Sequence, residues 1–297
     1  MKRLIVNADD FGLTSGVNRA IVELHQSGAL TSTTLMAIAE KTTEAVSLPR
    51  ILPSLGVGCH IVLVDGKPAL PAAQLPTLVN PATGRFRPTL GKFVMDLFLG
   101  RICRSEIEAE AEAQITRLQD WGLSLTHIDT HKHTHMFPRV LAPILSAAAR
   151  CRIKAVRNPF EPAWSLDATH QAPALRRLQV QLLNRFYSTF RNLVAKSGLA
   201  TTDGAVGVLA TGTLDAATLT SLLEAMPDGT WELVTHPGYN DSDLANARTR
   251  LLASRELELD ALRTAKFVRD VQLIHFADIA FSTGSLNSHP LAGSAGD

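Results

Sequence analysis

The sequence predicts an α/β fold, a single (β/α) barrel of irregular outline, and two patterns and the chain length support this prediction. Short runs of apolar and β-branched residues recur along the chain, and segments with helical spacing of apolar residues lie between them. Because parallel strands need crossover connections, this alternation indicates a parallel sheet covered by helices. The 297 residues suit one barrel of about 250 residues with a tail, although two domains of about 150 residues also fit.

Eight candidate strands and six candidate helices make up the alternation. The strands are short runs rich in β-branched and apolar residues, at 4–9, 32–38, 56–63, 125–129, 155–158, 207–210, 232–235 and 273–277. The helices are segments in which apolar residues recur three or four positions apart, at 15–27, 106–121, 138–150, 175–196, 215–226 and 254–269. All of these elements lie within residues 1–281, which we expect to form the barrel.

Three stretches depart from the alternation. Residues 64–90 contain five of the 15 prolines and predict a long loop after the third strand, where it would cover a site. Residues 282–297 are small and polar, which predicts a flexible tail. Residues 168–202 contain no Asp or Glu, and their apolar residues form one helical stripe between basic residues.

The basic amphipathic segment 168–202 allows two interpretations. It is either a barrel helix with arginines in solvent, or its part 175–196 lies on an anionic membrane or against a lipid-like substrate. Both interpretations fit the stripe of apolar residues, so the sequence leaves them open.

Charge and cysteine content narrow the class of protein. The 29 Lys and Arg nearly balance 28 Asp and Glu, so no whole-chain charge favours nucleic acid as a partner. The three cysteines lie far apart without a CxxC pair, which indicates neither a disulfide framework nor a zinc ribbon. The N-terminus lacks a signal-peptide pattern, and the longest apolar run is far shorter than the roughly 20 residues of a membrane span. We expect a soluble cytoplasmic protein, with peripheral contact to the inner membrane face as the alternative.

Candidate catalytic residues follow the candidate strands. Asp9 and Asp10 come directly after the first strand and point in different directions, so one can bind a metal while the other accepts a proton. His60 ends the third strand, and His236 precedes a proline at the end of the seventh. Each residue alone would more often have a structural role, but the strand ends of a β/α barrel meet on one face, where active sites lie.

Residues 127–135 hold four of the ten histidines of the chain. Alternate residues of an extended segment share a face, so we expect His127, Asp129, His131, His133 and His135 on one side while the strand persists. Imidazole and carboxylate ligands suit a divalent metal such as zinc. The run therefore predicts a metal site at the end of this strand.

Taken together, these motifs resemble the YdjC-like carbohydrate deacetylases, the family that includes chitooligosaccharide deacetylase. The matching segments extend over most of the chain and are LIVNADDFG, TSTT, GVGCHIVL, THIDTHKHTHMFP, ELVTHPGYND and RELELDAL. The segments VLVDGKPALP, GRF, HKHTHMFP and KAVRNPFEP are most similar to the branch named hopanoid biosynthesis-associated protein HpnK. The resemblance implies a (β/α) barrel of the polysaccharide-deacetylase type.

The resemblance also implies roles for single residues. The family pattern of metal ligands falls on Asp10, His60 and His131, its catalytic base on Asp9, and its motif histidine on His236. Lys132 stands where chitin-type members commonly have His, and Thr130 stands where they have Ser, which leaves the ligands in place but alters substrate contacts. Three further residues receive supporting or substrate-binding roles: Arg157, Asp129 and His127. We expect Arg157 to orient Asp9. Packing explains His127 equally well.

The implied function is hydrolysis of the N-acetyl amide of a substrate that bears N-acetylglucosamine, in this branch a hopanoid glycolipid. One divalent metal ion, zinc or magnesium, would activate the water and the carbonyl, with Asp9 as base and His236 as acid. Deacetylation of soluble chitooligosaccharides, hydrolysis of another bond such as a phosphoester, and a non-catalytic carbohydrate- or metal-binding module remain alternatives. A homodimer is the commonest assembly for such a protein.

Overall fold

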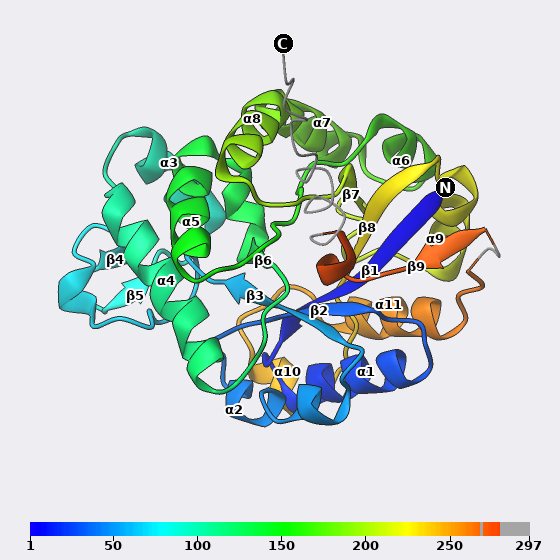
Figure 1. The fold of residues 1–297 in the computed structure, drawn as a ribbon, viewed down its shortest axis with the longest axis horizontal. Coiled ribbons are helices and arrows are strands. Elements are labelled where there is room, and N and C mark those ends of the chain that lie inside the picture. The colour runs from blue at the N-terminus through cyan, green and yellow to red at the C-terminus, as the bar shows by residue number, and fades with distance from the viewer. Residues whose placement is uncertain (268–269, 280–297) are drawn as a thin grey trace, which may run out of the picture.

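Strand β1 (Lys2–Phe11) lies at the centre of a curled parallel sheet in the computed structural model, which describes residues 1–267 and 270–279 (Figure 1). It pairs with β2 (Ser32–Leu35) on one side and with β8 (Gly229–Thr235) on the other. The sheet continues from β2 to β3 and β6, and from β8 to β7. The remaining strands of this sheet are β3 (Gly56–Ile61), β6 (Ile128–Thr130), β7 (Gly204–Val206) and β9 (Val271–Leu273), which pairs with the first residues of β1.

Single bridges, rather than a full strand, close the sheet into a barrel. Residues 155 and 156 bridge to Ala200 and Ile128, and the Ala205 amide donates a hydrogen bond of 3.1 Å to the Phe160 carbonyl. The predicted strand at 155–158 is thus reduced to isolated bridges, because Pro159 follows and has no amide proton to donate. This confirms the (β/α) barrel of irregular outline.

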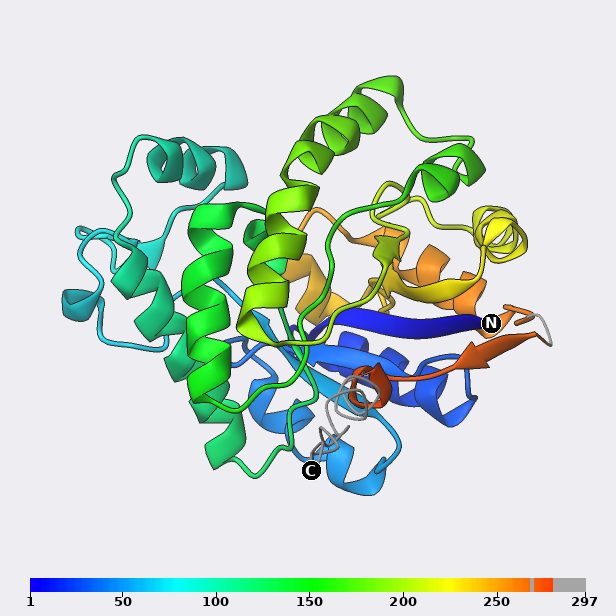
Figure 2. The same cartoon turned by 45° about the horizontal axis from the view of Figure 1, so that its top comes forward.

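Helices cover the outside of the sheet (Figures 1 and 2). Several begin at a side-chain cap that the sequence carries: Thr14 accepts from the Val17 amide at 3.1 Å, and Asp215 accepts from the Thr218 amide at 2.8 Å. The helices are α1 (Ser15–Gln26), α2 (Thr42–Ala45), α3 (Leu90–Phe98), α4 (Arg104–Asp120), α5 (Pro138–Arg150), α6 (Ala163–Ala168), α7 (Ala174–Leu183), α8 (Tyr187–Ser197), α9 (Ala216–Ala225), α10 (Ser242–Asn246) and α11 (Ala253–Arg263). The 3₁₀ turns are η1 (Leu48–Ile51), η2 (Ala72–Gln74), η3 (His131–Met136) and η4 (Asn184–Phe186).

Some predicted boundaries are wrong. The strand expected at 207–210 ends instead at Val206, because Gly207 has a φ of +85° and the backbone turns there. The strand expected at 273–277 is β9 and overlaps the prediction only at Leu273. The helix expected at 175–196 is two helices, α7 and α8, separated by η4. The predicted tail, 282–297, lies outside the described residues.

The loop predicted at 64–90 is an ordered segment attached to α4. It contains a short antiparallel pair, β4 (Val79–Asn80) and β5 (Arg85–Phe86). Helix α3 begins at its last residue and is not among the predicted helices. Glu110 of α4 accepts from the amides of Ala69 and Leu70 at 2.7 and 3.1 Å. Glu106, one turn earlier, accepts from the amides of residues 77 and 78 at 2.9 and 2.8 Å. Buried carboxylates that accept backbone amides fix this segment at the rim of the barrel.

The interior of the barrel is apolar at one end and charged at the other. A small apolar cluster lies at the end where β1 begins, and its members are Ile5, Ala155, Ala200, Ile274, Phe276 and Ile279. Alternate residues of a strand point the same way, so Asn7 and Asp9 follow Ile5 into the interior nearer the carboxyl ends of the strands. Within residues 1–267 and 270–279, no helix is long and apolar enough to cross a membrane.

Candidate active site

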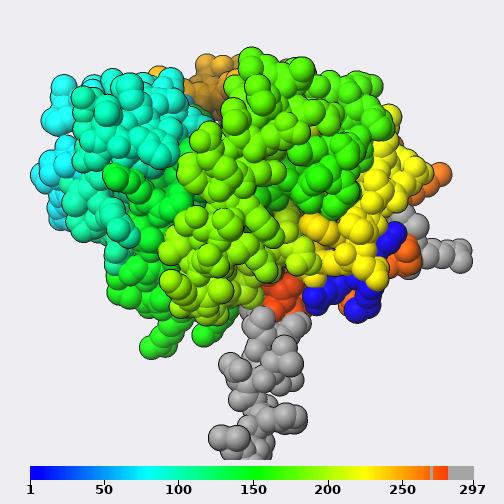
Figure 3. All heavy atoms as spheres, turned by 90° about the horizontal axis from the view of Figure 1, so that it is seen from above, coloured from blue at the N-terminus to red at the C-terminus, as the bar shows by residue number. Residues whose placement is uncertain are grey.

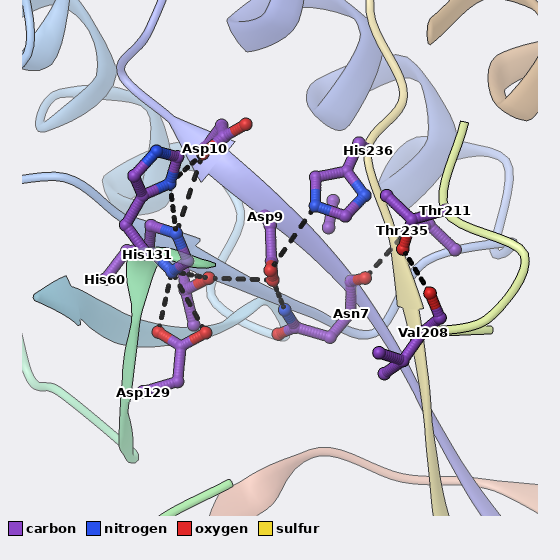
Figure 4. Close-up of polar contacts among 12 residues, drawn as sticks. Asn7, Asp9, Asp10, His60, Asp129, His131, Val208, Thr211, Thr235 and His236 are labelled. Carbon is purple, nitrogen blue, oxygen red and sulfur yellow. Dashed lines mark hydrogen bonds and ion pairs between the residues drawn. The ribbon is translucent and has the colours of Figure 1, made fainter. Parts of the chain in front are cut away.

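The residues expected at the strand ends come together at the carboxyl edge of the sheet (Figure 4). Asp9 and Asp10 lie near the end of β1, His60 lies on β3, His131 directly follows β6, and His236 directly follows β8. All four strands are parallel, so their carboxyl ends lie at the same edge. All of these side chains except that of His131 are buried.

Asp10, His60 and His131 are arranged as ligands of one cation. Asp10 Oδ1 lies 3.3 Å from His131 Nδ1 and 3.6 Å from His60 Nε2, and the two histidine nitrogens are 3.3 Å apart. Two ligand atoms at about 2.1 Å from a zinc ion are about 3.4 Å apart when the geometry is tetrahedral. Asp10 Oδ1 is also buried and accepts no hydrogen bond within the described part of the chain. The donor set therefore fits a divalent cation.

Asp9, His60 and Asp129 form a second group whose ligand atoms lie within 4.8 Å of one another. Here, however, Arg157 already pairs with both carboxylates. A guanidinium at this position neutralises the charge that would attract a cation, so the group with Asp10 is the better candidate.

The hydrogen bonds of His60 leave Nε2 free to act as a ligand. Its Nδ1 lies 2.8 and 3.0 Å from the two oxygens of Asp129, so Nδ1 carries the proton and the ring is fixed in orientation. Burial lowers the pKa of His60, but Asp129 and the neighbouring Asp9 and Asp10 outweigh it and raise that pKa to about 9. A cation would therefore compete with a proton for Nε2.

The segment after His131 departs from the predicted extended face. Lys132 and His133 have φ values of +58° and +50°, so the chain turns through η3 and the expected alternation ends at His131. His135 lies away from the ligands, with Nδ1 2.7 Å from Thr130 Oγ1 and Nε2 3.2 Å from the Arg157 carbonyl oxygen. Of the histidines in this run, His131 therefore lies at Asp10, whereas His135 is turned toward Thr130 and Arg157.

Arg157 binds Asp9 in the middle of the site. It is fully buried and donates through Nη1 and Nη2 to the two oxygens of Asp9 at 2.9 and 2.7 Å. It also pairs with Asp129 and, through Nε at 2.8 Å, with Glu232. Burial raises the pKa of Asp9, but Arg157, with smaller contributions from His60 and His236, holds it well below its usual range. Asp9 is therefore an oriented carboxylate.

His236 lies on the other side of Asp9 from the ligand group. Its Nε2 is 3.7 Å from Asp9 Oδ2 (Figure 4). Its backbone amide donates to Glu258 of α11 at 2.6 Å. The ring is mostly buried, and its Nδ1 has no hydrogen-bond partner among the described residues. The ring can therefore reach a substrate group that lies near Asp9.

Two residues of α11 belong to the site but received no role from the sequence. Arg255 is fully buried and donates to Asp10 Oδ2 at 2.5 Å, and Glu258 accepts from the amides of His236 and Gly212. Their spacing of three places them on the same face of the helix. The signal for both residues in the sequence is the segment RELELDAL, in which charged residues fall on the inward face of an amphipathic helix.

His127 lies apart from the ligand group. Its ring stacks on Phe276 with centroids 3.7 Å apart, and its Nδ1 is 2.9 Å from Thr126 Oγ1. Gly58 lies against this ring, since a Cβ there would come within 2.4 Å of it. Burial holds the pKa of His127 well below its usual range, so the ring is neutral and fits a packing role.

A cleft of about 360 Å³ opens beside Asp10 and His131. This volume is within the roughly 300 to 1,000 Å³ of small-ligand sites. Residues 36, 38–40, 62, 65–67 and 246–249 line it together with Arg85, so part of the segment 64–90 borders the cleft. A larger hollow of about 610 Å³ between α6, α8 and the starts of β7 and β8 touches none of the candidate residues. The cleft beside Asp10 is therefore the candidate substrate site.

Comparison with known proteins gives a consistent result along nearly the whole chain. A family model described as YdjC-like protein matches residues 3–272. A carbohydrate deacetylase of Geobacillus stearothermophilus is 34% identical over 280 residues, which cover 92% of this chain and 96% of that protein. A carbohydrate deacetylase of Brevibacillus brevis is 33% identical over 283 residues, which cover 93% and 99%.

Two further similarities concern a chitooligosaccharide enzyme and a solved structure. A chitooligosaccharide deacetylase of Salmonella paratyphi B is 40% identical over 166 residues, 55% of this chain and 62% of that protein. A crystal structure from Enterococcus faecalis, whose name assigns it provisionally to cellobiose-phosphate cleavage, superposes with a TM-score of 0.72. It is 26% identical, and the match covers 93% of this chain and 98% of that one.

Proposed function

The chain belongs to the family of YdjC-like proteins, and from this premise we propose that it hydrolyses the N-acetyl amide of a substrate that bears N-acetylglucosamine. Its relatives are named carbohydrate deacetylases and chitooligosaccharide deacetylases. The observation that carries the proposal is the ligand group of Asp10, His60 and His131 beside a paired Asp9 and His236 (Figure 4). A non-catalytic binding module would need the three metal ligands but not Asp9 and His236.

Asp10, His60 and His131 would hold the divalent cation. When bound, it would supply Lewis acidity for the acetyl carbonyl and for the hydrolytic water. Of the two ions that the sequence suggests, two imidazoles and one carboxylate suit zinc better than magnesium, which prefers oxygen ligands.

Asp9 and His236 would move the protons. Arg157 orients the Asp9 carboxylate, which accepts the proton of the attacking water. The water oxygen forms a bond to the acetyl carbon, the carbon–nitrogen bond breaks, and His236 donates a proton to the departing nitrogen. The products are acetate and a free amino sugar. Asp129 would support this reaction by fixing His60, and Arg157 by joining Asp129 to Asp9.

The finer proposal is a lipid-linked substrate, a hopanoid glycolipid, as the HpnK-like segments imply. The exposed stripe of α7 supports it, because Leu175, Leu178 and Leu182 are 68, 51 and 49% exposed and no residue of α7 is buried. Phe98 of the neighbouring α3 is 53% exposed, and its ring lies 6.5 Å from that of Phe186. Figure 3 shows the green residues of α6 to α8 spread over one face.

The charges of this face suit an anionic lipid surface, because residues 168–202 contain no Asp or Glu. Arg176 and Arg177 keep their charge but donate to backbone carbonyls of residues 166, 169, 208 and 211, which holds α7 in place. Arg185 and Lys196 are exposed. The same proposal includes peripheral contact through 175–196 with the cytoplasmic face of the inner membrane. It also includes a homodimer.

The test is acetate release by metal-reconstituted protein from an N-acetylglucosaminyl hopanoid and from diacetylchitobiose, each with and without chelator. We expect chelator-sensitive release from the lipid. Release from diacetylchitobiose alone would keep the deacetylase and discard the lipid substrate. Release from neither would contradict the proposed reaction.

A further inference from the structure

Among the described residues, Arg255 of α11 is the one side chain outside the ligand group that makes a hydrogen bond to the side chain of Asp10. Its Nη2 donates to Asp10 Oδ2 at 2.5 Å, and both side chains are almost completely buried. The two residues are 245 positions apart in the chain. The fold creates this contact, because α11 lies after β8, the strand that pairs with β1. No residue near Asp10 in the sequence indicates it.

The contact divides the two oxygens of Asp10 between different partners. Oδ2 is taken by Arg255, whereas Oδ1 is buried, accepts no hydrogen bond from residues 1–267 or 270–279 and lies within 3.6 Å of both histidine nitrogens. A free carboxylate can bind a cation through one oxygen or through both. With Arg255 in place, only Oδ1 is available.

The surroundings of Arg255 hold its guanidinium in this position. Nε donates to the Leu251 carbonyl at 3.1 Å, and the Arg255 carbonyl accepts from the Gly238 amide at 3.2 Å. A Cβ at Gly238 would lie only 3.1 Å from Arg255 Cδ and 2.9 Å from a methyl group of Val17. The side chain is thus enclosed by α11 and by the turn after His236.

The backbone of Asp10 also needs an external contact. Asp10 has a φ of +65°, a left-handed conformation that residues other than glycine adopt at a cost of about 1 kcal/mol or more. Such a conformation persists where neighbouring groups determine the position of the residue. The pairing with Arg255 is such a contact, since it fixes the far end of the side chain.

We propose that Arg255 is a positioning residue of the metal site, which holds Asp10 Oδ2 so that Asp10 presents Oδ1 alone to the cation. If Asp10 offered one oxygen only, a bound cation would keep more positions for the water and the acetyl group. The inference rests on the proposed function for the presence of a cation, and it adds the residue that sets the binding mode of one ligand.

The test measures zinc affinity by calorimetry in the absence of substrate. Arg255→Met is expected to raise the Kd for zinc about 10- to 100-fold, the usual effect of losing a group that orients a ligand. Arg255→Lys keeps the positive charge on a shorter side chain and should raise the Kd for zinc less. Arg263→Met is the matched control on α11, because Arg263 is 40% exposed, pairs with Glu23 and should leave the Kd unchanged.

A double substitution separates positioning from a general effect on folding. Because Arg255 acts only through Asp10, Arg255→Met should cause no further loss of zinc affinity in an Asp10→Ala background. Equal losses in both backgrounds, or unchanged or tighter zinc binding by Arg255→Met, would overturn the proposal. Thermal unfolding of each metal-free variant checks the fold, and if Arg255→Met does not fold, unchanged affinity of Arg255→Lys is the overturning result.

Zinc affinity and acetate release give independent answers. A protein that shows the expected affinities but releases no acetate contradicts the proposed function and keeps the role of Arg255. If the protein releases acetate but Arg255→Met leaves the Kd for zinc unchanged, the proposed function is kept and the role of Arg255 is contradicted.

Discussion

Arg157 shows how a single residue organises the charged end of the barrel. Its guanidinium pairs with Asp9, Asp129 and Glu232, all of them buried. Buried carboxylates are costly unless a cation and hydrogen bonds compensate them. Arg157 supplies both, so Asp9 keeps its charge although its side chain is buried.

Asp9→Asn is the substitution that separates an enzyme from a binding module. The amide keeps the size of the side chain but cannot accept the proton of water, so acetate release should fall about 100- to 10,000-fold. Zinc binding by the same variant should be retained, since Asp9 is outside the ligand group. A variant that keeps the wild-type rate would contradict the role of Asp9 as base.

Glu232 should make stability depend on pH. Burial raises the pKa of Glu232 from 4.5 to about 7, although Arg157 counteracts this. Because the folded-state pKa is the higher one, the protonated form favours folding below pH 4.5, and this stability is lost as the pH rises through about 7.

Urea unfolding of Glu232→Gln, compared with the parent between these pH values, measures this effect. The parent should gain free energy of unfolding relative to the variant as the pH falls. A difference between the two proteins that does not change with pH would contradict the raised pKa.

At the scale of elements, α4 determines the position of the long segment that borders the cleft. Glu106 and Glu110 bind four backbone amides of residues 69–78, and these amides have no strand partners there. The sequence predicts a loop from its prolines, but the order of the loop depends on two side chains of a later helix. The same holds for α11, whose inward residues bind Asp10 and the amide of His236.

Glu110→Ala should release part of this segment. The amides of Ala69 and Leu70 lose their acceptor, and hydrogen exchange at these two positions should accelerate by an amount equivalent to about 1 to 3 kcal/mol. Glu112→Ala is the matched control, because that side chain is 39% exposed and pairs with Arg150. Unchanged exchange at Ala69 and Leu70 would show that other contacts hold the segment.

At the scale of the whole molecule, the exposed apolar surface and the cleft beside Asp10 are separate features of one barrel. Leu175 and Leu178 project from a helix without a buried residue, whereas Phe190 of α8 is fully buried and belongs to the core. The predicted amphipathic segment thus divides into an outer helix and an inner one (Figure 2). The exposed leucines that support the proposed membrane contact lie on the outer helix.

Replacing Leu175 and Leu178 together by Ser should weaken binding to anionic vesicles without reducing turnover of diacetylchitobiose. Each substitution removes apolar surface that would leave water when the protein binds the vesicle, and this transfer is worth about 25 cal/mol per Å² buried. Ile51→Ser is the control, because Ile51 is 69% exposed and lies outside this face on η1. Vesicle sedimentation measures the binding, and equal binding of all three proteins would remove the membrane contact.

The barrel and the strand-end residues were predictable because both follow from local patterns. Alternating apolar runs give parallel strands, and the carboxyl ends of parallel strands meet, so Asp9, Asp10, His60, His131 and His236 could be grouped in advance. Boundaries were less predictable where a single residue decides them, as at Gly207 and Pro159. The end of the extended face at His131 depends on two left-handed residues with no such signal.

The sequence by itself determined the α/β class, the family and the residues that could serve as ligands, base and acid, because these depend on residue type and on short spacing. Only the tertiary structure decided which atoms meet. Arg157 reaches Asp9 across 148 positions and Arg255 reaches Asp10 across 245, so both pairings form only in the folded chain. Contacts of this range depend on how the helices pack against the sheet, which no local pattern encodes.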